Sequence, residues 1–136
     1  MSEEKNQSTN HNYHIKSDID SKNQRIKGHA YEDMATDFLK DKGYTILEQN
    51  YFCKIGEVDI IARCDNTVVF VEVKYRKNDS YGDPLEAVTQ AKMRKICRVA
   101  DFYMMSHKLG EVSARFDVIG VLGNEITHIE NAFEYR

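Results

Sequence analysis

The stretch Val68-Val69-Phe70-Val71-Glu72-Val73-Lys74 decides the fold. Its apolar side chains fall on both alternating faces, which is typical of an interior strand covered on both sides. The same alternation places Phe70, Glu72 and Lys74 on one face, so that a carboxylate and an amine project together near the end of a buried strand. Burying charges costs free energy unless they are paired. The stretch therefore predicts a central strand with a charge set that has a chemical use.

A second acid precedes this strand. Asp59 lies in Gly56-Glu57-Val58-Asp59-Ile60-Ile61-Ala62, and the next segment, Cys64-Asp65-Asn66-Thr67, has the composition of a hairpin turn. Antiparallel pairing would let Asp59 project beside Glu72. An acid on one strand, then an acid, a spacer and a lysine on the next, form the D…E-x-K skeleton of metal-dependent phosphodiesterases. Asp59, Glu72 and the Val73 carbonyl could ligate Mg²⁺ or Mn²⁺, with Lys74 beside the phosphate.

Each of these residues also has a simpler interpretation. Glu72 and Lys74 alone would be read as a structural ion pair at a strand end, and Asp59 alone as a surface acid near a turn. Glu32 lies about 20° around a predicted helix from Leu39, at the edge of the buried stripe, where it could complete the site or be an ordinary surface acid. His29, one helical turn before Glu32, could support it. The combination of the three acids with Lys74 favours the catalytic interpretation.

The surrounding segments predict an α/β fold. The apolar spacing of Tyr31, Met34, Ala35, Phe38 and Leu39 indicates a helix that Gly43 ends. Strands are expected over 44–50, 57–63, 68–76, 115–122 and 126–129. A second helix begins at Asp83-Pro84-Leu85-Glu86, with a break near Thr89 where the apolar phase shifts. The order α-β-β-β-α-β-β predicts a mixed five-stranded sheet flanked by helices.

Composition indicates a soluble protein with one domain. The chain has 136 residues, of which 41% are hydrophobic and 30% charged. Residues 1–24 lack a hydrophobic period and are expected to form a disordered tail, with a single domain over 25–136. No apolar run is long enough to span a membrane, no secretory signal is recognisable, and three cysteines without a C-x-x-C pair indicate reduced thiols. We expect a cytoplasmic protein.

Basic residues gather between positions 74 and 98, although the formal net charge is −3. Nucleic acid responds to local potential, so this stripe predicts phosphate contacts. The alternative is a solvated helix face. Tyr75 and Tyr81 flank the loop after the third strand and either pack or stack on unpaired bases. The candidate phosphate contacts beyond Lys74 are Arg76, Lys77, Lys92, Arg94, Lys95 and Arg98.

Several sequence blocks resemble one family. They are Gly28 with Glu32 and Ala35, residues 43–47 with Asn50, 56–62, 69–76, 84–88 with Lys92, 115–119 and 128–133. The chain is identified on these blocks as a member of the YraN-like family of uncharacterised bacterial proteins. That family is similar to archaeal Holliday junction resolvases and to the PD-(D/E)xK nuclease superfamily.

The resemblance implies a restriction-endonuclease-like fold and a Mg²⁺- or Mn²⁺-dependent endonuclease acting on DNA, with branched or otherwise structured DNA as a candidate substrate. It implies Asp59 and Glu72 as metal ligands, Lys74 as the catalytic lysine and Glu32 as the auxiliary acid. It also places Gln90 or Lys92 near the phosphate, and it suggests a homodimer. Tyr31 departs from the family pattern, which usually has glycine before the helix glutamate. The alternatives are a catalytically silent nucleic-acid-binding module and an interaction protein with a structural charge set.

Overall fold

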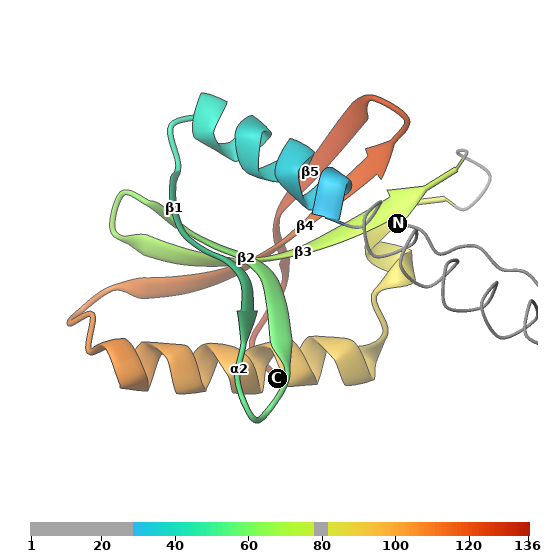
Figure 1. Ribbon diagram of the computed structural model, residues 1–136. Helices are drawn as coiled ribbons and strands as arrows, with labels where there is room; N and C mark the ends of the chain where they lie inside the picture. Colours follow the sequence, from blue (N-terminus) through green and yellow to red (C-terminus); the bar gives the residue numbers. More distant parts are fainter. Residues whose placement is uncertain (1–28, 78–81) are drawn as a thin grey trace, which may run out of the picture.

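A five-stranded mixed sheet forms the centre of the computed structural model, which describes residues 29–77 and 82–136 (Figure 1). The strands lie in sequence order across the sheet, and only β3 and β4 are parallel. The predicted element order and mixed sheet are confirmed. The predicted tail over 1–24, the domain start at residue 25, and Tyr81 lie outside the described residues. The strands are β1 (Thr45–Phe52), β2 (Glu57–Cys64), β3 (Thr67–Arg76), β4 (Ser113–Leu122) and β5 (Glu125–Phe133).

One helix covers each face of the sheet. In Figure 1, α1 (residues 29–41) and α2 (Gln90–His107) lie on opposite sides of the strands. Val69 and Val71 pack in a cluster with Leu39 of α1, whereas Val68 and Phe70 pack in a second cluster with Ile96 of α2. The parallel step from β3 to β4 requires the long connection that α2 provides. The prediction that β3 is an interior strand covered on both faces is confirmed.

The predicted break near Thr89 is also confirmed. A short 3₁₀ helix, η2 (Pro84–Ala87), ends before α2 begins, and each has its own cap. The Asp83 carboxylate accepts a hydrogen bond from the Leu85 amide at 3.0 Å, and the Thr89 hydroxyl accepts one from the Lys92 amide at 3.1 Å. Both caps satisfy amides that have no partner within the helix. They fix where α2 starts relative to the end of β3.

The fifth strand extends beyond the expected 126–129, and its pairing with β4 contains an irregularity. The pairing of β4 with β5 shifts register between Phe116 and Val118, and Asn131 has a φ of 52°. The Asp117 carboxylate accepts a hydrogen bond from the Asn131 amide at 2.9 Å and pairs with Arg115 at 3.0 Å. This buried carboxylate satisfies the amide that the register shift leaves without a strand partner.

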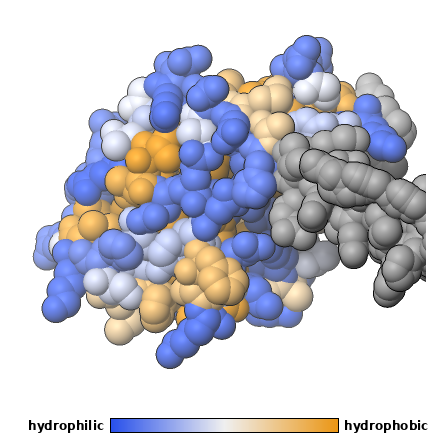
Figure 2. Space-filling view, in the orientation of Figure 1, coloured by the Kyte–Doolittle hydropathy of each residue, from blue (hydrophilic) through white to orange (hydrophobic). Residues whose placement is uncertain are grey.

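The surface is mostly polar. Figure 2 shows hydrophilic side chains over much of one face, with apolar atoms in separate patches. Among the described residues, the large apolar or aromatic side chains that are exposed are scattered: Phe52, Tyr75, Met105 and Tyr135. Within residues 29–77 and 82–136, no helix is both long and apolar enough to cross a membrane.

Candidate active site

The site forms where β2 and β3 stop pairing. Their ladder runs from Cys64 opposite Thr67 to Ile60 opposite Val71, and beyond that point β2 pairs only with β1 and β3 only with β4. We call this point the fork. The Asp59 carboxylate lies in the fork and accepts a hydrogen bond from the Val73 amide at 2.8 Å. Asp59 thus replaces the missing strand partner, and the interaction holds its carboxylate against β3.

Glu72 is the buried acid of the site. Its residue is 5% exposed, one carboxylate oxygen (Oε2) lies 3.6 Å from Lys74 Nζ, and the other (Oε1) has no hydrogen-bond partner. The pKa of Glu72 is raised to about 7. Burial is the largest cause and the negative charge of Asp59 the next, whereas the positive charges of Lys92 and Lys74 oppose the shift. Glu72 and Lys74 therefore project together from β3, as strand alternation predicts.

Glu32 reaches the same region from α1. Its side chain is 16% exposed, and its Oε1 is buried and has no hydrogen-bond partner. The pKa of Glu32 is raised to about 7. Burial is the largest cause and the charge of Asp59 the next, whereas a hydrogen bond from Asn50 opposes the shift. His29 Nδ1 lies 3.9 Å from Glu32 Oε1, in agreement with the spacing argument. The structure thus brings Glu32 into electrostatic contact with the D…E-x-K residues.

The donor set fits a hard divalent cation. Glu32 and Glu72 each hold a buried oxygen without a hydrogen-bond donor, and Asp59 lies close enough to raise the pKa of both. Oxygen ligands of this kind suit Mg²⁺ and Mn²⁺. In the part of the chain that the structure describes, no three His, Cys, Asp or Glu side chains are gathered closely enough to form a finished metal centre. Ionised acids at this site repel one another, and a cation would offset that repulsion.

The structure distinguishes between Gln90 and Lys92. The charge of Lys92, in the first turn of α2, acts on the Glu72 carboxylate. Gln90 accepts a hydrogen bond from the Arg136 guanidinium at the C-terminal end of the chain. Lys92 is therefore the helix residue that lies near the fork, as a consequence of the Thr89 cap.

The predicted basic stripe is divided. Arg76 is 8% exposed and donates a hydrogen bond to the Gly82 carbonyl at 2.6 Å, and Arg98 bonds to the Tyr135 hydroxyl and the Arg136 carbonyl. The Arg76 guanidinium is buried, whereas the Arg98 side chain is 42% exposed and is held by its bonds to Tyr135 and Arg136. The bonding partners of both guanidiniums were not predicted, because a sequence window does not show which distant backbone carbonyls will pack beside it. The role of Arg76 and Arg98 as phosphate contacts stays a prediction. Lys77, Arg94 and Lys95 remain exposed.

Two features of the site were missed by sequence reasoning. Asn50 has a φ of 53°, hydrogen-bonds to Glu32, and lies 3.4 Å from His29 Nδ1. Asparagine tolerates this left-handed conformation better than most residues. An asparagine two residues before the end of a strand was therefore the signal that could have indicated a special backbone position here. The second feature is a stack of Tyr31 on Tyr75, with ring centroids 3.9 Å apart. These residues are far apart in the sequence, and no local pattern links them.

Comparison with known proteins places the chain in a family. A family model described as "Uncharacterised protein family UPF0102" matches residues 31–121. The chain belongs to the UPF0102 family. A UPF0102 protein of Persephonella marina is 42% identical over 109 residues, covering 80% of this chain and 94% of that protein. A UPF0102 protein of Syntrophus aciditrophicus is 47% identical over 111 residues, covering 79% and 87%. The resemblance to the YraN-like family is thereby confirmed, and the UPF0102 name itself assigns no activity.

Proposed function

We propose that this protein is a metal-dependent endonuclease that hydrolyses DNA phosphodiester bonds, with branched or otherwise structured DNA as its substrate. One observation carries the proposal: Asp59 of β2 lies within electrostatic range of both Glu32 of α1 and Glu72 of β3, beside Lys74, and these two glutamates keep a buried oxygen without a hydrogen-bond donor. Burial of unsatisfied acids costs free energy, and a structural role alone does not require it. The placement of the acids on strands and a helix supports a rigid site.

Each residue has a role in this proposal. Asp59 and Glu72, with the Val73 carbonyl, would hold Mg²⁺ or Mn²⁺. The cation would lower the pKa of a water and offset charge on the phosphoryl oxygens. Lys74, whose side chain is 32% exposed, can donate hydrogen bonds to a phosphate oxygen or to the water. Glu32, with a pKa of about 7, can accept or release a proton near neutral pH.

The basic residues support a nucleic-acid substrate. Lys92 lies near Glu72, and Lys77, Arg94 and Lys95 offer exposed positive charge on the end of β3 and on α2. Such contacts would position the backbone without reading its sequence. A homodimer and a cytoplasmic location remain predictions that rest on the resemblance and the composition.

A cleavage assay tests the proposal. Labelled four-way, flapped, single-stranded and plain duplex DNA are incubated with the full chain and Mg²⁺ or Mn²⁺. We expect cleavage that EDTA abolishes, and a loss on the order of 100-fold in Lys74→Ala and Asp59→Asn. Lys40→Ala, which removes an exposed lysine from α1, is the matched control and should cleave normally. DNA binding without cleavage of any substrate would instead leave the catalytically silent binding module.

A further inference from the structure

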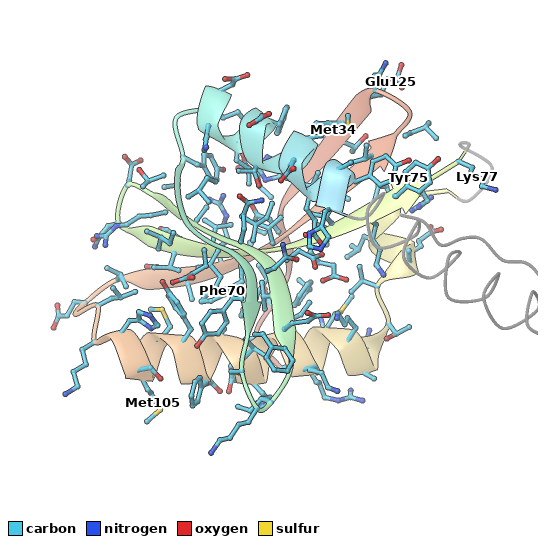
Figure 3. The ribbon with its side chains drawn as sticks, in the orientation of Figure 1. Met34, Phe70, Tyr75, Lys77, Met105 and Glu125 are labelled. Atoms are coloured by element: carbon cyan, nitrogen blue, oxygen red, sulfur yellow. The ribbon has the colours of Figure 1, made fainter. Side chains whose placement is uncertain are left out.

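The stacked pair of Tyr31 and Tyr75 lies next to the candidate active site on two separate elements. Tyr31 immediately precedes Glu32 on α1, and Tyr75 immediately follows Lys74 on β3. The ring centroids are 3.9 Å apart and the ring planes differ by 8°. Figure 3 shows Tyr75 beside the first turn of α1, near the end of β3, with Lys77 just beyond that end. The pair therefore has a fixed position relative to the residues proposed to act on the phosphate.

The two rings differ in exposure. Tyr31 is half-buried and packs against the cluster between α1 and the sheet, whereas Tyr75 is 41% exposed. Tyr75 is thus the outer ring, and Tyr31 supports it from the inner side. A supported ring loses little conformational freedom when a ligand stacks on it, and this lowers the entropic cost of binding.

The geometry of the pair resembles that of stacked bases. Aromatic side chains usually meet edge-to-face or offset, with centroids about 4.5–7 Å apart. This pair is closer and nearly parallel, and its spacing approaches the rise of about 3.4 Å between bases along a nucleic-acid strand. A base could therefore extend the stack on the outer face of Tyr75.

The charges beside Tyr75 suit a nucleic-acid strand. Lys74 precedes the ring, and exposed Lys77 follows it two residues later. Lys74 and Tyr75 project from opposite faces of β3 near its end, so a nucleic-acid strand that crosses this end could place one phosphate at Lys74 and its neighbouring nucleotide at Tyr75. In a continuous duplex both faces of each base are covered by adjacent bases, so only an unpaired or terminal base offers a free face. Sequence-tolerant stacking of this kind is how aromatic residues bind single strands.

We propose that Tyr75, supported by Tyr31, is a stacking site for an unpaired base that flanks the phosphate at Lys74. The proposal rests on the proposed nuclease function and narrows its substrate to DNA with a single-stranded segment beside the cleaved bond. It also gives Tyr31, which departs from the family pattern, a role in substrate selection.

Binding measured without cleavage tests this proposal. The full chain is titrated in EDTA with a duplex carrying a single-stranded overhang labelled with 2-aminopurine, and with a relaxed, covalently closed circular duplex, which has no terminal base. Tyr75→Ala should weaken overhang binding on the order of tenfold and leave binding to the closed duplex unchanged. Met105→Ala, which removes another large exposed side chain, should alter neither. Tyr75→Trp should retain overhang binding, and the fluorescence of this single tryptophan should be quenched.

The outcomes separate this proposal from the nuclease proposal. Overhang binding by Tyr75→Ala equal to that of the wild type would overturn the stacking site, even if the protein cleaves DNA. An equal loss on the closed circular duplex would overturn it as well, because the ring would then not select a base with a free face. Selective loss on the overhang in a protein that never cleaves would sustain the stacking site and reject the nuclease.

Discussion

A carboxylic acid that is buried without a donor for one oxygen opposes folding whenever it ionises. Glu72 is such an acid, since its residue is 5% exposed and its pKa is raised from 4.5 to about 7. Between these two pH values the native state holds a proton that the unfolded chain releases. The free energy of unfolding therefore falls as pH rises through this window, and the penalty is complete above pH 7.

Glu72→Gln should accordingly stabilise the metal-free protein. The shift in the pKa of Glu72 corresponds to roughly 3 kcal/mol. Repulsion within the group of Asp59, Glu32 and Glu72 contributes to this penalty, so we expect Glu72→Gln to raise the free energy of unfolding by about 1–3 kcal/mol at pH 8. At pH 5 the gain should be small, because Glu72 is already protonated there. Urea unfolding of the wild type and the variant at pH 8 and pH 5 measures the gain in the free energy of unfolding at each pH. Destabilisation at pH 8 would mean that Glu72 and Lys74 form a structural ion pair.

At the residue scale, local rules predicted much of the site. Alternation along one strand places Glu72 and Lys74 on the same face, and helical spacing places Glu32 at the edge of the buried stripe. The partners of Arg76 and Arg98 could not be predicted, because those guanidiniums bond to backbone carbonyls whose positions depend on tertiary packing. The stack of Tyr31 on Tyr75 could not be predicted either, because tertiary packing alone brings these two residues together.

At the element scale, the connection from β3 to α2 sets the position of Lys92. η2 packs on β4 through Pro84, and Gly120 makes this approach possible because a Cβ there would lie 2.3 Å from Pro84 Cγ. Sequence reasoning found the helix start and the break near Thr89 from capping residues and apolar phase. The length of β5 was underestimated because Glu130 and Asn131 are polar, and the buried Asp117 that bonds to the Asn131 amide lies on another strand.

Gly120→Ala should displace η2 and destabilise the fold. The added methyl would overlap Pro84, a rigid ring next to backbone, and overpacking of this kind costs about 1–3 kcal/mol. Gly56→Ala is the matched control, because its Cβ would crowd only the flexible stem of Lys95, at 3.0 Å, and would meet Val99 Cγ2 at an ordinary contact distance of 3.6 Å. Thermal melts of both variants check the difference. Equal stability of the two variants would show that η2 is not held against β4.

At the scale of the whole molecule, the site depends on four elements meeting at one end of the sheet. Asp59 and Glu72 come from β2 and β3, Glu32 from α1 and Lys92 from α2. The fork between β2 and β3 gives the acids room, and the helices on opposite faces bury them. The fold class follows from element order, whereas the convergence of these side chains follows from where the β2–β3 ladder ends, which sequence alone does not give.

A magnesium titration of the full chain, followed by backbone amide NMR at pH 8, tests the central claim most directly. We predict shifts that cluster at Glu32, Asp59, Glu72 and Val73 and disappear in Asp59→Asn, because the acids would then share a cation with the Val73 peptide beside it. The absence of shifts at these residues up to millimolar Mg²⁺ would contradict the account of a metal-dependent site.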